Sequence, residues 1–369
     1  MDFTFDETQQ DVLDLATTIL TDRGKPERLS AVEAAGDSVD EVVWQDLAAA
    51  GLIGIALPEE LGGSGAGFTE LCVLVQAAAR ACVRVPLVDT AVAVAAPLAR
   101  FGTPEQRERL VAPFAAGTTL LVGALTRPGG RAARPVVTRT ADGWALRGVL
   151  SHVPAADRAE RLLVDAADET GRVGLFLVDL RSSTVERTPH ATVDRLPRWH
   201  VRLTDTPVAD ADVVRACGDA ADVLDWTLPR IDAARCAAQL GRCDAALTLT
   251  ATYVSEREQF TRPIGSFQAV AHRLADAYID TEGLRLTTWQ AIWLLAEELP
   301  AEEALAIATV WATEAPTRVG EAAMHLHGGT SVDLDYPVHR AFLGAKNDVF
   351  ALGGPGQRLE ELGDLLAVS

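Results

Sequence analysis

The sequence predicts an α+β protein in which a helical part, a β part and a second helical part follow one another along 369 residues. In the first third, apolar residues repeat with the 3.6-residue period of a helix. In the middle, short apolar runs are separated by Gly, Pro, Asp and Ser. Long segments with few helix breakers fill the last third. We expect domains over residues 1–117, 118–218 and 219–369.

The first part begins with a clear helix signal. Asp6 and Gln9 have the spacing of a capping box. The apolar stripe that follows consists of Val12, Leu15, Ala16 and Ile19. A further helix is predicted over residues 44–52, and another begins at Thr103, with Pro104 in the first helical position. This part is therefore expected to be a helical domain.

The middle part is typical of a small β domain. Its strand-like runs cover residues 136–138, 144–146, 162–164, 174–178 and 201–203. In the last part, helices are predicted over residues 231–256, around the apolar stripe 267–279, over 302–325 and over 357–366. Because long helices joined by short loops favour antiparallel packing, we expect a helical bundle.

Composition excludes several classes of protein. The net charge of −19 argues against nucleic acid and against an anionic membrane surface as partners, since both recruit stripes of Lys and Arg. The five cysteines form no CxxC pair, which favours reduced thiols over disulfides or a metal site. No apolar run is long enough to span a membrane, and residues 1–5 lack the features of a signal peptide. We therefore expect a cytoplasmic protein without a metal.

Three motifs carry a family resemblance. The segment from Arg257 to Gln268 reads REQFTRPIGSFQ and resembles the RxxFGxPIGxFQ signature of the acyl-CoA dehydrogenase family. Residues 325–329, HLHGG, resemble the QxxGG element of the same family, with His325 in place of Gln. Residues 51–63 resemble the N-terminal pattern of the family. The resemblance extends over essentially the whole chain.

The resemblance implies a fold and a reaction. Members have an N-terminal helical domain, a central β-barrel-like domain and a C-terminal four-helix bundle, and they assemble into tetramers. FAD lies between the β domain of one subunit and the bundle of its neighbour. The reaction is the α,β-dehydrogenation of an acyl-CoA thioester. A carboxylate removes the α proton, a hydride passes to the flavin, and an acceptor of the electron-transfer flavoprotein type reoxidises it.

The resemblance also implies which residues contact the cofactor. Arg257 is expected at the FAD pyrophosphate, because its guanidinium can bond two phosphate oxygens. Phe260 is expected to pack on the cofactor, and Gln268 to bond near its adenine end. Alone, these would be a surface Arg, a core Phe and a Gln at a helix start, but the intact segment favours cofactor contact. The other expected cofactor residues are His325, Gly328 and Gly329, the glycines allowing close approach of the backbone.

The expected catalytic base is missing. In the family, the usual catalytic Glu lies six residues after a Lys that aligns with Lys346. In this chain the residue at that position is Leu352, which cannot accept a proton. Some members place the base about 26 residues before the motif Arg, which here is Ile231, with Asp232 next to it. One residue rotates a helix by about 100°, so Asp232 is expected to face elsewhere. It is a candidate base, but a solvated position or a partnership with the helix dipole fits better.

The flavin side departs from the family as well. Residues 126–128, Thr-Arg-Pro, stand where members have Thr-Glu-Pro or similar, without the acidic element that follows. Members have an aromatic or apolar residue, Ile, and Thr or Ser where this chain has His152, Val153 and Pro154. Pro154 offers neither an N–H nor a hydroxyl. We interpret His152 as a structural or partly exposed residue rather than a base.

Three functions are compatible with these residues. The chain resembles the base-less subunit of actinobacterial α₂β₂ acyl-CoA dehydrogenases, some of which act on steroid side-chain CoA thioesters. Such a subunit would donate its adenosine-side contacts to a related partner that carries the Glu. The alternatives are a self-sufficient homotetrameric enzyme with a displaced base such as Asp232, and a flavin-free binding or scaffold protein of the same fold.

Overall fold

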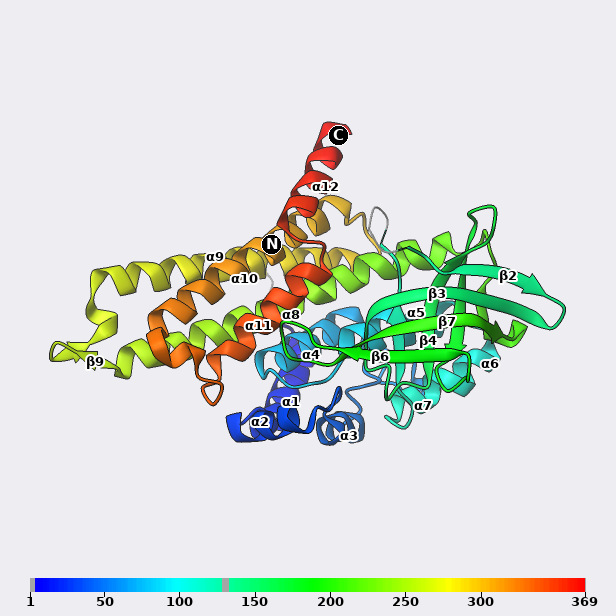
Figure 1. The fold of residues 1–369 in the computed structure, drawn as a ribbon. Helices are drawn as coiled ribbons and strands as arrows, with labels where there is room; N and C mark the ends of the chain where they lie inside the picture. Colours follow the sequence, from blue (N-terminus) through cyan, green and yellow to red (C-terminus); the bar gives the residue numbers. More distant parts are fainter. Residues whose placement is uncertain (1–3, 128–132, 369) are drawn as a thin grey trace.

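A computed structural model describes residues 4–127 and 133–368 of the chain. The helices and strands follow in the order helical, β, helical (Figure 1), which confirms the predicted fold class. In the described part of the chain, no helix is both long and apolar enough to cross a membrane.

Helices of the N-terminal part pack on one buried core. Asp6 and Gln9 form the expected capping box at the start of α1, and Thr103 and Gln106 form another at α6. The longest uninterrupted helix after α1 is α4, which is buried on several faces and packs against the bundle. The elements are α1 (Glu7–Arg23), α2 (Pro26–Ala35), α3 (Glu41–Ala49), η1 (Glu59–Leu61), α4 (Phe68–Arg80), η2 (Val88–Ala95), α5 (Ala96–Phe101), α6 (Pro104–Gln106), η3 (Arg107–Val111) and α7 (Ala112–Ala115).

The middle part is one curved, mostly antiparallel sheet in the order β6-β7-β3-β2-β4-β5-β8, with β1 parallel to β4. Alternate side chains of the sheet enclose a second core, which includes Val137, Leu146, Phe176 and Val201. All five predicted runs lie in strands, while β1, β6 and β8 were not predicted. The bounds are β1 (Leu121–Ala124), β2 (Val136–Thr140), β3 (Gly143–Pro154), β4 (Arg161–Ala167), β5 (Val173–Asp179), β6 (Val185–His190), β7 (Arg198–Val208), η4 (Asp210–Asp212) and β8 (Val213–Arg215).

The C-terminal part is a bundle of long helices. Helix α8 lies in its middle, in contact with α4, α9, α10 and α11. The helix predicted over 357–366 is present as α12, which contacts α10 at its base and projects outward (Figure 1), whereas α11, which packs against α8 and α10, was not predicted. The elements are α8 (Ala221–Glu256), β9 (Glu258–Gln259), β10 (Arg262–Pro263), η5 (Ile264–Ser266), α9 (Gln268–Ala296), α10 (Glu302–His327), η6 (Gly328–Val332), α11 (Val338–Ala351) and α12 (Pro355–Val368).

The arrangement separates two regions that the sequence motifs single out. The short β9–β10 hairpin, which carries the first motif, lies at one end of the long bundle, and the sheet lies at the opposite end (Figure 1). The first motif therefore cannot reach the sheet of its own chain.

Candidate functional site

The first motif forms an exposed hairpin at the end of α8. Arg257 ends the helix, its backbone N–H donating to the carbonyl of Tyr253 at 2.8 Å. Phe260 and Thr261 connect β9 and β10 with left-handed φ angles of 52° and 68°. Neither residue type favours this conformation, and the Phe260 side chain is 85% exposed. A strained turn that presents an aromatic ring to solvent indicates a surface built for contact.

The second motif lies beside the first. His327 is buried, its Nδ1 lies 2.8 Å from the carbonyl oxygen of Ala323, and its ring stacks on Tyr253 with centroids 4.5 Å apart. Tyr253 is one helical turn before Arg257, so this stack fixes the two motifs relative to one another.

The turn after His327 exposes the remaining predicted cofactor residues. Gly328 has a φ of +58°, and a Cβ at Gly328 or Gly329 would meet no atom within 4 Å. His325 and Gln268 are exposed on the same end of the bundle. The six predicted cofactor residues are therefore all exposed, and the glycine turn leaves the backbone open to the approach of a phosphate group.

An apolar groove continues from this surface between α8 and α9. Its volume is about 980 Å³, and it is lined by side chains such as Leu247, Val254, Leu274 and Tyr278, with Pro263 and Gly265 at the hairpin end. The groove has the size that small-molecule and cofactor sites commonly have.

At the position of the family base, Leu352 is completely buried at the end of α11. Its carbonyl oxygen accepts a hydrogen bond from Nε of Arg358. The side chain offers no group that could take a proton, as expected from the sequence.

Asp232 is neither solvated nor a partner of the helix dipole, and that interpretation was wrong. It lies in the middle of α8, is only 6% exposed and forms ion pairs with Arg127 and Arg358. The distance from Arg358 Nη2 to Asp232 Oδ2 is 3.3 Å. Burial lowers the pKa of Arg127. Asp232 does face another direction than Ile231, but α4, α10 and α11 pack around α8. The face on which Asp232 lies is therefore buried rather than in contact with solvent.

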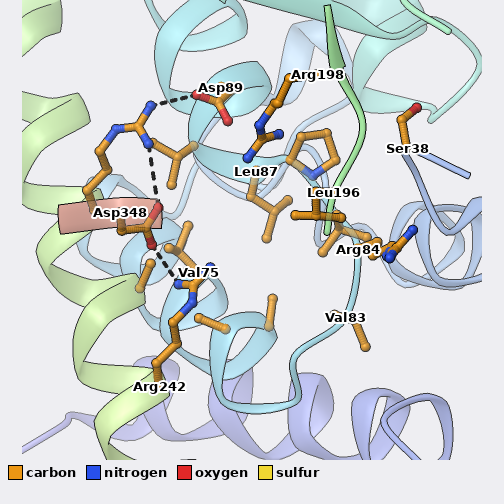
Figure 2. Close-up of a pocket in the computed structure, with 17 residues that line it drawn as sticks. Ser38, Val75, Val83, Arg84, Leu87, Asp89, Leu196, Arg198, Arg242 and Asp348 are labelled. Carbon is orange, nitrogen blue, oxygen red and sulfur yellow. Dashed lines mark hydrogen bonds and ion pairs between the residues drawn. The ribbon is translucent and has the colours of Figure 1, made fainter. Parts of the chain in front are cut away.

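A second group of ion pairs lies close by and was missed from the sequence. Arg235 Nη2 is 2.7 Å from Asp89 Oδ1, and Arg242 Nη1 is 2.7 Å from Asp348 Oδ2 (Figure 2). One feature of the sequence could have indicated these buried ion pairs, because Arg235 is a charged residue within an Ala-rich stretch of the predicted helix. The cavity beside these pairs has a volume of about 90 Å³. This is well below the roughly 300–1,000 Å³ of ordinary small-molecule pockets, so it cannot hold an acyl-CoA thioester.

The residues expected on the flavin side lie at the end of β3. His152 is exposed at a φ of +61°, and its ring lies 4.6 Å from that of His190. Val153 and Pro154 are buried at the end of β3. Residue 128 of the Thr-Arg-Pro segment lies outside the described residues. Within the described ranges no group of three or more His, Cys, Asp or Glu is arranged to hold a metal ion.

Comparison with known proteins defines the class of protein. Residues 6–118 match the family described as acyl-CoA dehydrogenase, N-terminal domain, and residues 222–357 match acyl-CoA dehydrogenase, C-terminal domain. The chain belongs to the acyl-CoA dehydrogenase family.

Among its relatives, the acyl-CoA dehydrogenase FadE27 of Mycobacterium tuberculosis is 38% identical, with 100% of this chain and 99% of that protein covered. FadE28 of the same organism is 32% identical, with 98% of each covered. The crystal structure of the ChsE4-ChsE5 complex from Mycobacterium tuberculosis contains a chain with a TM-score of 0.94 and 38% identity over 100% of both chains. A chain of the Tcur3481-Tcur3483 steroid ACAD has a TM-score of 0.89 and 41% identity over 98% of both.

Proposed function

We propose that this chain is the non-catalytic subunit of a heteromeric acyl-CoA dehydrogenase. It would supply Arg257, Phe260 and Gln268, with the Gly328–Gly329 turn, to FAD held mainly by a related subunit. The observation that carries the proposal is the placement of the cofactor motifs, exposed at the end of the bundle that lies away from the chain's own sheet (Figure 1).

The role of each residue in holding FAD follows from the chemistry of its side chain or backbone. The guanidinium of Arg257 would hold the pyrophosphate, the ring of Phe260 would pack on the cofactor, and the glycine turn would let the backbone approach the adenosine diphosphate portion. When bound, FAD supplies the acceptor for the hydride that leaves the acyl chain. On this chain's own flavin side, Pro154 has no N–H to offer.

The missing base supports the same conclusion. Leu352 cannot accept a proton, and the carboxylate of Asp232 is engaged by two guanidiniums. Because both of its oxygens lie in ion pairs within the protein, this carboxylate is not free to approach the α carbon of a substrate. The α proton would therefore be removed by a Glu of the partner subunit.

The substrate and the electron acceptor are parts of the proposal too. The chain's likeness to the steroid ACAD and to a chain of a two-protein complex favours a CoA thioester of a steroid side chain. An acceptor of the electron-transfer flavoprotein type would reoxidise the cofactor. A self-sufficient enzyme using Asp232 is disfavoured by the ion pairs, and a flavin-free scaffold by the intact motifs.

Co-expression with a related subunit that carries the Glu tests this function. The purified complex is expected to contain one FAD for every two chains and to oxidise an acyl-CoA. The chain purified alone is expected to show no such activity. A flavin-saturated homotetramer of this chain, or one that reduces an acceptor with an acyl-CoA by itself, would contradict the proposal.

A further inference from the structure

Two small cavities adjoin where α4, α8 and α11 meet the segment between β6 and β7. Their volumes are about 90 and 60 Å³, and both are lined by Arg84 and Arg242. Figure 2 shows the larger of the two. We call the two together the arginine cavity. It lies between the helical domain, the β domain and the bundle.

Charge in the arginine cavity is unlike that of the chain as a whole. The protein has a net charge of −19. The cavity is lined by more arginines than carboxylates, namely Arg84, Arg195, Arg198, Arg235, Arg242 and Arg340 against Glu33, Asp89, Asp194 and Asp348. His339 adds a further nitrogen-bearing side chain. Cationic groups therefore gather around a partly enclosed space in a strongly acidic protein.

Three of these six arginines form a close ion pair with a carboxylate. Arg235 pairs with Asp89, Arg242 with Asp348, and Arg340 with Glu33, each at 2.7 Å. These three arginines are therefore neutralised within the protein.

In the described part of the chain, two cavity arginines have no carboxylate partner at such a short distance. Arg84 is 8% exposed, and its side chain donates only to the carbonyl oxygens of Asp37 at 2.8 Å and Arg195 at 3.4 Å, with no carboxylate partner in the described part of the chain. Arg198 extends toward the interior of the pocket (Figure 2) and forms only a long ion pair, with 3.7 Å between its Nη2 and Oδ2 of Asp194. Arg195, in contrast, is exposed to solvent.

A buried guanidinium without a directly bonded carboxylate is costly, because desolvation penalises its charge. For Arg84, the more distant carboxylates of Glu33, Asp194 and Asp37 offset this penalty only in part. Burial accordingly lowers the pKa of Arg84. Guanidiniums bond oxyanions through two parallel N–H groups, and the cavity has room for several water-sized groups. We propose that the arginine cavity binds one small oxyanion, a phosphate or a small carboxylate, through Arg84 and Arg198. This site is independent of the proposed role in FAD binding.

Anion binding to the purified full-length chain, or to its complex with a partner, tests the proposal. The probes are inorganic phosphate and acetate, each measured by isothermal titration calorimetry at constant ionic strength in chloride. One anion per chain is expected. Arg198→Gln and Arg84→Gln should each weaken binding roughly ten- to hundredfold, as for the loss of a charge-assisted pair. Arg202→Gln, on an exposed side chain of β7, serves as the matched control and should leave binding unchanged.

The two probes separate the sources of the oxyanion. Saturable binding of phosphate alone indicates a phosphate group, and saturable binding of acetate alone indicates a carboxylate. Arg84→Lys, which keeps the charge, should retain more binding than Arg84→Gln, which separates loss of the anion contact from loss of folding. Absence of saturable binding by both probes, or binding that Arg198→Gln leaves intact, would show that water alone solvates these arginines and would overturn the proposal.

Discussion

Replacing Asp232 by Asn distinguishes a structural ion pair from a catalytic base. The substitution keeps the shape of the side chain but removes the one negative charge between Arg127 and Arg358. At 3.3 Å and an effective dielectric constant of about 20, one such pair corresponds to about 5 kcal/mol of Coulomb energy. Arg358 keeps Glu361 at 2.7 Å, whereas Arg127 loses its one ion pair among the described residues. We therefore expect the free energy of unfolding to fall by about 3–5 kcal/mol.

Urea unfolding followed by circular dichroism measures this change. Asp225→Asn, at an exposed position of the same helix, is the control and should change the free energy of unfolding by less than about 0.5 kcal/mol. Adding Arg127→Met to Asp232→Asn should cost less than the sum of the single changes, because the two side chains act as one pair. Two results together would refute the structural role and make Asp232 the base. The free energy of unfolding of Asp232→Asn would lie within about 1 kcal/mol of the parent value, and the variant would lose an acyl-CoA oxidation that the parent chain shows on its own.

Two further predictions concern packing and pH. Gly241→Ala should lower the thermal midpoint although alanine is the better helix former, because its Cβ would lie 2.2 Å from the carbonyl oxygen of Gln76. Gly363→Ala, with no atom within 4 Å, should raise it slightly, and equal effects would contradict the packing argument. Burial lowers the pKa of His327 below its ordinary value of 6.5, so the unfolded chain binds the proton more tightly. The stabilisation that comes from neutral His327 is therefore fully present above pH 6.5. It is lost as the pH falls from there toward the pKa of His327 in the folded state. Thermal midpoints measured from pH 7 to pH 5 should therefore fall less in His327→Gln, whereas an identical slope in both proteins would contradict the assignment.

Local signals in the sequence were sufficient for many elements. The capping boxes at Asp6 and Thr103 depend on residues only three positions apart, and both are present in the structure. Helix α11 was missed because its stability depends on distant contacts. Arg340 on this helix bonds Glu33, and Gly344 leaves room for Arg242, whose Nε would be 2.5 Å from a Cβ there. Neither contact can be derived from a periodic pattern.

In the candidate site too, features that depend on neighbouring residues could be predicted from the sequence, and features that depend on distant contacts could not. The exposed motif around Arg257 is contiguous in sequence, so its residue types could be recognised without a structure. The environment of Asp232 could not, because its partners come from residues 127 and 358, on a segment after β1 and on α12. The helical rotation argument treated a turn away from residue 231 as a turn toward solvent, and it failed because α8 is covered on its other faces.

The FAD content of the complex carrying Arg257→Ala tests the central claim most directly. The chain would be co-expressed with the Glu-bearing partner, and flavin per complex would be measured by absorbance after denaturation, with Lys25→Ala at an exposed ion pair as the control. Loss of the pyrophosphate contact should weaken FAD binding roughly ten- to hundredfold while the chains remain associated. The control should retain one FAD for every two chains. Full FAD content and unchanged affinity in Arg257→Ala would contradict the donation of this motif across the subunit interface.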